Sequence, residues 1–224
     1  MTTLERQPGE ETSTRNSKLL RNPLNRDALN LPNLITVSRL VLAVVLFALI
    51  YADGYWITSA FVFVIAAGTD FLDGWLARKY EQVTAVGRIL DPFADKIIVI
   101  GAFVFLLNKE TKIGDEIVNS GVNAWMVIVI LGREMFVTSL RGFLEQQGKD
   151  FSASLSGKLK MITQCIAVPM SLLSLSPVII ERFDWFSNFR DFFLWGTVII
   201  TLASGGIYIV RAVQLMSADA EIEP

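Results

Sequence analysis

The sequence predicts an all-α membrane protein with six transmembrane helices, and three observations lead to that class. Hydrophobic residues make up 52% of the 224 residues and charged residues only 19%, whereas soluble proteins carry roughly 25% charged residues. Six apolar segments each have roughly the 20 residues that a helix needs to cross a bilayer. Polar segments separate them, so we expect the chain to pass back and forth through one membrane domain.

The first three spans are expected at residues 34–52, 56–77 and 87–107. Asp53-Gly54 is a tight-turn sequence between the first two spans, and Trp56 is expected to anchor the second span in the interface. Arg39 is the only charged residue of the first span, so it either reaches the lipid headgroups or faces a functional site. A short polar segment joins the second and third spans, which places the end of one and the start of the next at the same membrane face.

The last three spans are expected at residues 124–144, 159–175 and 192–215. Polar loops are expected at residues 108–123 and 142–158, and an aromatic loop that lies in the membrane interface at 176–191. Ser204-Gly205-Gly206 in the sixth span would allow a close contact with another helix, and dimerisation is one possible use of it.

The domain organisation follows from these spans. Residues 1–30 are expected to form a cytoplasmic arm that is partly disordered or amphipathic, residues 31–216 the six-helix membrane domain, and residues 217–224 an acidic tail.

The distribution of Lys and Arg predicts the orientation, because these residues are enriched in cytoplasmic loops. Six spans put both termini on one side. Four basic residues lie on the opposite side, namely Lys109, Lys112, Arg182 and Arg190. Thirteen lie on the side of the termini, namely Arg6, Arg15, Lys18, Arg21, Arg26, Arg78, Lys79, Arg88, Arg141, Lys149, Lys158, Lys160 and Arg211. We therefore expect a multi-pass membrane protein with both termini in the cytoplasm.

Four aspartates at the end of the second span and the start of the third are the strongest functional signal. Asp70 and Asp73 are three residues apart and Asp91 and Asp95 four apart, and on helices both spacings place side chains on one face. Ionisable residues at membrane depth are costly and indicate function. The chain has no His and one Cys, so an oxygen-only site would favour Mg²⁺ or Mn²⁺, or Ca²⁺. Alternatively, the acids form buried salt bridges with Arg78, Arg88 and Lys96.

These acids belong to a longer pattern that runs from Asp70 to Asp95: Asp-x-x-Asp-Gly-x-x-Ala-Arg, eight residues, then Gly-x-x-x-Asp-x-x-x-Asp. The pattern resembles the signature of the CDP-alcohol phosphotransferases, which are integral membrane enzymes of phospholipid synthesis. The resemblance implies a six-helix fold, usually dimeric, with two divalent cations, Mg²⁺ or Mn²⁺, at the cytoplasmic face.

The same resemblance implies roles for individual residues. Asp70, Asp73 and Asp91 would be principally metal ligands, and Asp95 would act as the general base in addition to its place among the metal ligands. The nucleotide would pack against the small residues of the motif and beside its arginine, that is, against Gly74, Ala77, Arg78 and Gly87.

A second set of charged residues follows in the fourth and fifth spans. Arg133 and Arg141 are eight residues apart, about two helical turns, and so share a face. With Lys158 they would suit an acceptor that carries its own phosphate, because Arg binds phosphate through paired N–H donors. Arg133 could equally form an ion pair with Glu134. Lys160, like Lys149, is expected to contact lipid headgroups.

Three further patterns resemble the bacterial phosphatidylglycerophosphate synthases: Leu31–Arg39, Gly132-Arg133-Glu134 with Arg141, and Gly157-Lys158-Leu159-Lys160. The resemblance implies transfer of the phosphatidyl group from CDP-diacylglycerol to sn-glycerol 3-phosphate, with attack of the acceptor hydroxyl on the β-phosphorus and release of CMP. Within the family, a cardiolipin, phosphatidylserine or phosphatidylinositol-phosphate synthase is the alternative. A cation transporter that uses the acids is a more remote one.

Overall fold

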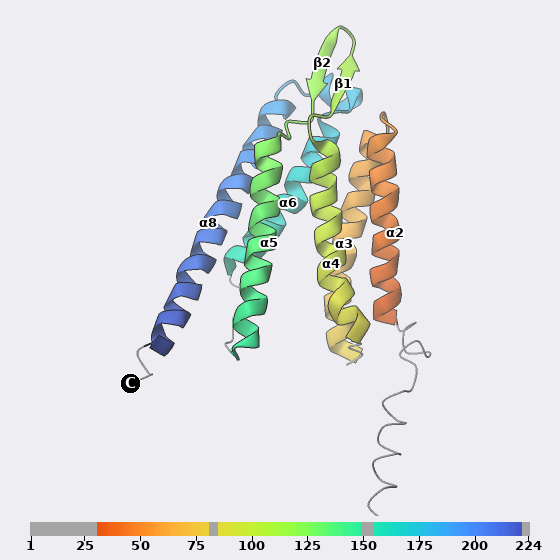
Figure 1. The fold of residues 1–224 in the computed structure, drawn as a ribbon. Helices are drawn as coiled ribbons and strands as arrows, with labels where there is room; N and C mark the ends of the chain where they lie inside the picture. The colour runs from red at the N-terminus through yellow and green to blue at the C-terminus, as the bar shows by residue number, and fades with distance from the viewer. Residues whose placement is uncertain (1–30, 81–84, 149–154, 221–224) are drawn as a thin grey trace, which may run out of the picture.

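The computed structural model describes the backbone of residues 31–80, 85–148 and 155–220. Side chains are described for these segments except at residues 31–35, 70–92, 95, 155–156 and 218–220. The described segments contain six long helices. They lie side by side, and each runs in the direction opposite to the one before it (Figure 1). The described part of the chain is thus mostly helical, as expected, with one small β-hairpin in addition.

The long helices are α2 (Leu31–Tyr51), α3 (Trp56–Tyr80), α4 (Ala85–Leu106), α5 (Ala124–Gln146), α6 (Leu155–Leu173) and α8 (Phe186–Ala220). A one-turn helix, α7 (Pro177–Ile180), precedes the last of them. Each predicted apolar span forms one long helix. By length and composition, one helix of the described segments is long and apolar enough to cross a membrane, Phe186–Ser217. Shorter apolar stretches lie at Thr36–Tyr51, Trp56–Thr69 and Lys96–Leu106.

A continuous apolar core joins the helices. Its buried side chains include Leu46 of α2, Phe63 of α3, Phe103 of α4, Ile130 of α5 and Leu172 of α6. Helix α2 packs against α3 and α4, while α6 packs against α3 and α8, and α5 against α8. The core residues on these helices lie in the second half of α2, α4 and α6 and in the first half of α3, α5 and α8, so the core joins the six helices in the half of the bundle nearer the α4–α5 connection.

The connection between α4 and α5, predicted as a polar loop, contains an antiparallel hairpin of β1 (Glu110–Ile113) and β2 (Glu116–Asn119). Ile113 pairs with Glu116, so the turn consists of Gly114 and Asp115. Gly114 has φ +61°, a conformation that glycine adopts without strain at the first position of a two-residue hairpin turn. The Gly-Asp pair in the sequence could have predicted this turn.

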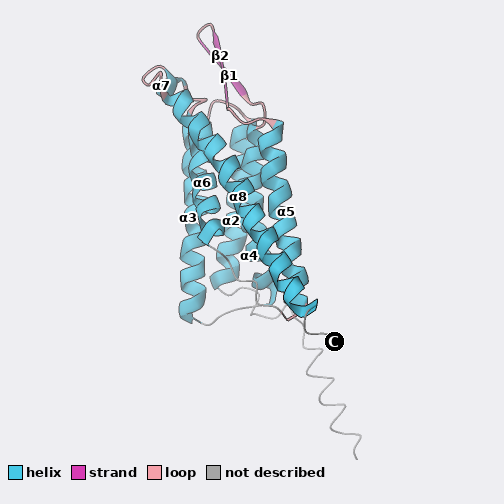
Figure 2. Ribbon diagram, turned by 90° about the vertical axis from the view of Figure 1, so that its left-hand side faces the viewer, coloured by secondary structure: helices cyan, strands magenta, loops and turns pink. Residues whose placement is uncertain are grey.

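The hairpin lies beside α7, at the end of the bundle opposite the last turns of α3 and the first turns of α4 (Figure 1 and Figure 2). Its base is fixed by buried polar contacts. Ser120 Oγ donates to the carbonyl oxygen of Leu106 (2.6 Å), and Ser171 Oγ donates to the carbonyl oxygen of Ser120 (2.6 Å). The Arg190 guanidinium donates to the carbonyl oxygen of Asn119 and to Ser174 Oγ. These contacts tie the hairpin to α4, α6 and α8.

Two predicted boundaries of the α5–α6 connection are wrong. Residues 142–158 were expected to form a loop, but α5 continues through Gln146 and α6 begins at Leu155. Glycine at position 142 costs a helix about 1 kcal/mol. The helix continues because Leu144 is fully buried against a small cluster with Val137, Tyr208 and Ala212.

The aromatic segment 176–191 is also more helical than expected, because α8 already begins at Phe186. Trp185 and Phe189 pack edge to face with ring centroids 5.5 Å apart, and Phe189 and Phe193 do so at 4.9 Å. Residues four apart are neighbours on a helix surface, so these pairs favour a helix over a loop. At its other end α8 continues through Ala220, four residues into the predicted tail. The predicted arm, residues 1–30, lies outside the described residues.

Candidate functional site

The backbone brings both halves of the acidic motif to one end of the bundle. Asp70 and Asp73 lie in the last three turns of α3, and Asp91 and Asp95 in the first three turns of α4. These helix ends lie at the same end of the molecule in Figure 1, as the short connection required. We call it the motif end.

The side chains of the four aspartates lie outside the described part of the structure. The same holds for the predicted nucleotide-binding residues, Gly74, Ala77, Arg78 and Gly87. Among the side chains that are described, no group of three or more His, Cys, Asp or Glu could hold a metal ion. The roles of the aspartates as metal ligands, and of Asp95 as base, therefore stay predictions.

A cavity of about 610 Å³ lies between α4, α5, α6 and α8. We call it the cationic cavity, because four basic residues contribute to its wall. The described residues that line it are Lys96, Arg133, Glu134, Val137, Thr138, Arg141, Gly142, Glu145, Gly157, Lys158, Met161 and Tyr208. All three residues predicted to bind the acceptor, Arg133, Arg141 and Lys158, are brought together here.

The charges of the lining side chains do not cancel. Among the described lining side chains four are cationic, Lys96, Arg133, Arg141 and Lys158, and two are anionic, Glu134 and Glu145, so these described side chains carry an excess of two positive charges. Lys160, outside the lining, forms an ion pair with Glu134 and further reduces the negative charge near the wall. A cavity of this charge attracts a dianion such as a phosphate monoester.

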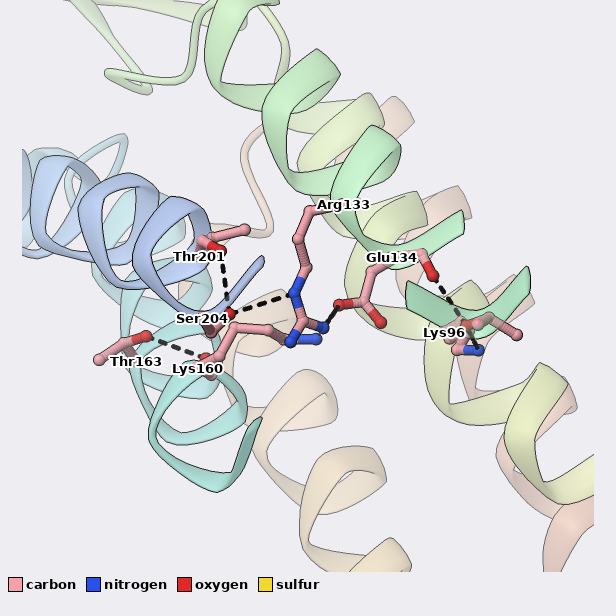
Figure 3. A network of polar contacts seen from close by, with 8 residues as sticks. Lys96, Arg133, Glu134, Lys160, Thr163, Thr201 and Ser204 are labelled. Atoms are coloured by element: carbon pink, nitrogen blue, oxygen red, sulfur yellow. Dashed lines mark hydrogen bonds and ion pairs between the residues drawn. The ribbon is translucent and has the colours of Figure 1, made fainter. Parts of the chain in front are cut away.

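Arg133 is the most constrained of these cations. Its Nε donates to Ser204 Oγ (3.1 Å) and its Nη1 to Glu134 Oε1 (2.9 Å), and its Cζ lies 5.3 Å from the centre of the Tyr208 ring. The remaining nitrogen, Nη2, is buried and has no hydrogen-bond partner in the described segments. Figure 3 shows the side chain between α5 and α8. Arg133 thus forms the predicted ion pair with Glu134, and one of its nitrogens has no hydrogen-bond partner among the described residues.

Glu134 bridges two buried cations. The same oxygen that accepts from Arg133 also accepts from Lys160 Nζ. Lys160 is only 8% exposed, so the interpretation of Lys160 as a headgroup contact is wrong. The physical reason is that α6 packs against α8 and α3, and this packing turns Lys160 inward toward a carboxylate. Lys149 lies outside the described residues.

Lys96 also lines the cavity, whereas from the sequence it was predicted only as a possible salt-bridge partner of the motif aspartates. Its Nζ donates to Thr138 Oγ1 (2.6 Å), and Thr138 Oγ1 donates to the carbonyl oxygen of Glu134 (2.7 Å). Because Lys96 follows Asp95 directly on α4, its position connects the motif end with the cationic cavity. A lysine inside an apolar span was the signal that could have indicated this role.

Two other predictions concern Arg39 in α2 and the Ser204-Gly205-Gly206 segment in α8. Arg39 is 1% exposed, so it does not reach the headgroup region, and its alternative role at a site stays a prediction. A Cβ on Gly205 would lie 3.3 Å from Arg133 Cγ. The close contact predicted at Ser204-Gly205-Gly206 is therefore made with α5 of the same chain, while a role in dimerisation stays a prediction.

Comparison with known proteins gives consistent matches. The family model described as CDP-alcohol phosphatidyltransferase matches residues 29–204. The chain is similar to CDP-diacylglycerol–glycerol-3-phosphate 3-phosphatidyltransferases of several organisms. It is 36% identical to that of Bacillus subtilis over 196 residues, which cover 81% of this chain and 94% of the relative. It is 33% identical to that of Rickettsia typhi over 181 residues, which cover 80% and 94%.

Proposed function

The chain belongs to the CDP-alcohol phosphatidyltransferase family, and on that premise we propose which reaction it catalyses. It transfers the phosphatidyl group of CDP-diacylglycerol to sn-glycerol 3-phosphate, which yields phosphatidylglycerophosphate and CMP. The names of the relatives support this choice of donor and acceptor. The observation that carries it in this chain is the cationic cavity.

The acceptor binds in the cationic cavity through its phosphate. The excess of two positive charges matches a phosphate monoester, and Arg133 Nη2 offers a buried donor without a partner in the described protein. Charge-assisted hydrogen bonds of this type are roughly twice as strong as those between neutral groups. An acceptor without net charge, such as serine, would leave the excess positive charge of the cavity without a counter-charge.

The acidic motif carries the chemistry of transfer. Asp95 accepts the proton of the acceptor hydroxyl while the hydroxyl oxygen attacks the β-phosphorus of CDP-diacylglycerol. The bond between that phosphorus and the oxygen of CMP breaks, and CMP leaves. Gly74, Ala77 and Gly87 leave space for the nucleotide, and Arg78 lies beside its phosphates. The four carboxylates form an oxygen-only donor set, which fits hard divalent cations such as Mg²⁺ or Mn²⁺. Bound there, two such cations would neutralise charge on the pyrophosphate.

The six long helices cross the bacterial cytoplasmic membrane, with both termini and the motif end at the cytoplasmic face. Large apolar side chains on the outer faces support this proposal, for example Val44 (67% exposed), Phe61 (65%) and Ile199 (63%). Soluble monomers rarely expose extended apolar surface. Residues 31–216 then form the membrane domain, and we expect it to work as a homodimer.

The proposed function is tested by CMP release from purified protein in detergent with Mg²⁺ or Mn²⁺ and CDP-diacylglycerol. Glycerol 3-phosphate, serine, inositol phosphate and phosphatidylglycerol are added one at a time. Release with glycerol 3-phosphate alone is expected. Release with another acceptor would keep the family and reject the acceptor. An absence of metal-dependent release with every acceptor, from protein shown to be folded, would reject the enzymatic proposal and favour cation transport.

A further inference from the structure

We propose that α8 positions Arg133 for the acceptor phosphate, through three residues within one turn of that helix: Ser204, Gly205 and Tyr208. This inference rests on the proposed function, because it takes the cationic cavity as the acceptor site. These three residues are positioning residues, since they act on the acceptor through Arg133. Helix α8 thereby takes part in acceptor recognition. The charged residues from which the sequence predicted an acceptor site lie on α5 and α6 instead.

Ser204 fixes one edge of the guanidinium. It is 1% exposed, and its Oγ donates to the carbonyl oxygen of Thr201 (2.9 Å). That bond uses the only hydroxyl proton of Ser204, so the lone pairs of Oγ are left to accept from Arg133 Nε (3.1 Å). The hydroxyl is therefore oriented as an acceptor before any ligand binds. Figure 3 shows this chain of contacts from Thr201 through Ser204 to Arg133.

Gly205 and Tyr208 fix the stem and the face of the same side chain. A Cβ at Gly205 would lie 3.3 Å from Arg133 Cγ, so the arginine stem passes directly over the glycine. Tyr208, one turn further on and buried, presents its ring 5.3 Å from Arg133 Cζ, which is within the range of a cation–π contact. With Glu134 on Nη1, edge, stem and face all have a protein partner.

One nitrogen of the guanidinium is left over by this arrangement. Nη2 is buried and has no hydrogen-bond partner in the described segments, and Arg133 lines the cationic cavity. Preorganised donors bind tightly because little conformational freedom is lost on binding. Small displacements of a positioned group reduce activity strongly, since a misplacement of about 1 Å can cost roughly 100-fold. The position of the Arg133 side chain against α8 should therefore control the affinity for the acceptor.

Two neighbouring glycines provide a matched test. Gly205→Ala adds a methyl group that must displace the Arg133 stem by a few tenths of an ångström, whereas Gly206→Ala adds the same group where no atom lies within 4 Å. Both changes have the same effect on helix propensity. We expect Gly205→Ala to raise KM for glycerol 3-phosphate about tenfold, with KM for CDP-diacylglycerol and kcat close to wild type. We expect Gly206→Ala to match wild type in all three constants.

The outcomes separate this inference from the function on which it rests. If wild type shows no turnover with glycerol 3-phosphate, the proposed function fails and the inference fails with it. If wild type turns over but the two glycine variants have the same constants, the function stands and the inference is rejected. A Gly205→Ala variant that raises both KM values equally would also reject it, because a general distortion does not select the acceptor.

If Gly205→Ala does not fold, a second pair of variants tests whether α8 positions Arg133. Tyr208→Phe keeps the ring over the guanidinium, while Tyr208→Leu removes it. We expect KM for glycerol 3-phosphate to be several-fold higher in the leucine variant than in the phenylalanine variant, since a cation–π contact contributes roughly 0.5–2 kcal/mol. Equal KM values in the two variants would overturn the role of the ring.

Discussion

Removal of the charge of Glu134 should destabilise the protein more than the loss of any other single carboxylate among the described side chains. Glu134 Oε1 accepts from both Arg133 and Lys160. The side chains of all three residues are at most 10% exposed. Glu134→Gln therefore leaves two buried cations near each other without a counter-charge.

The magnitude follows from this burial. Breaking a buried ion pair by removing one partner costs about 3–5 kcal/mol. Glutamine keeps a carbonyl oxygen that can accept one hydrogen bond, so we expect the lower limit, about 3 kcal/mol. For a chain of this size, 1 kcal/mol changes the midpoint of thermal unfolding by roughly 2–4 °C. The expected decrease in Tm is therefore roughly 6–12 °C.

The assay is thermal unfolding of the purified protein in detergent, followed by intrinsic tryptophan fluorescence. Glu145→Gln is the matched control, because Glu145 lies on the same helix and lines the same cavity but is exposed. Exposed substitutions usually change stability by less than about 0.5 kcal/mol, so the control Tm should stay within roughly 2 °C of wild type.

A double variant tests whether the charges are the cause. Glu134→Gln combined with Lys160→Met removes one of the two uncompensated cations, so it should recover about half of the lost stability, which is a coupling that a double-mutant cycle measures directly. A Tm for Glu134→Gln equal to that of the Glu145→Gln control would refute the reasoning. So would a double variant less stable than Glu134→Gln alone.

Three further predictions concern activity. Arg141→Ala should raise KM for glycerol 3-phosphate about tenfold or more and KM for CDP-diacylglycerol much less, because one phosphate contact is lost; equal increases would argue against an acceptor site at Arg141. Asp95→Asn should abolish turnover while the Tm stays close to wild type, and near-normal activity would reject Asp95 as the base. Lys96→Met should raise KM for glycerol 3-phosphate. Its control is Lys109→Met, because Lys109 pairs with Asp53 (2.8 Å) far from the cavity. Equal kinetics for these two lysine variants would remove Lys96 from the acceptor site.

Local patterns predicted most of the fold. Apolar segments of about 20 residues gave each long helix, and Asp53-Gly54 gave the turn between α2 and α3, where both residues have positive φ. The boundaries that failed depended on contacts between distant segments. Helix α5 continues past Gly142 because Leu144 is buried against Tyr208 of α8, and no local pattern contains that contact.

In the candidate site, too, local spacing predicted some features, while others depend on contacts between distant segments. The spacing of eight residues predicted that Arg133 and Arg141 share a face, and both line the cationic cavity with Lys158. The inward direction of Lys160 depends on how α6 is rotated against its neighbours, which a count of positive charges along the chain does not determine. Ser204 and Tyr208 were not assigned to the site either, because their role depends on a contact between α5 and α8.

In the proposed reaction the phosphate of glycerol 3-phosphate becomes part of a lipid. The most direct measurement uses glycerol 3-phosphate labelled with radioactive phosphorus, together with unlabelled CDP-diacylglycerol, and follows the label into the organic phase while CMP is quantified in the aqueous phase. We predict labelled lipid and CMP in equal amounts for the wild type and neither product for Asp95→Asn. Release of CMP without label in the lipid would contradict the proposed function, because the phosphatidyl group would then be transferred to water or to another acceptor.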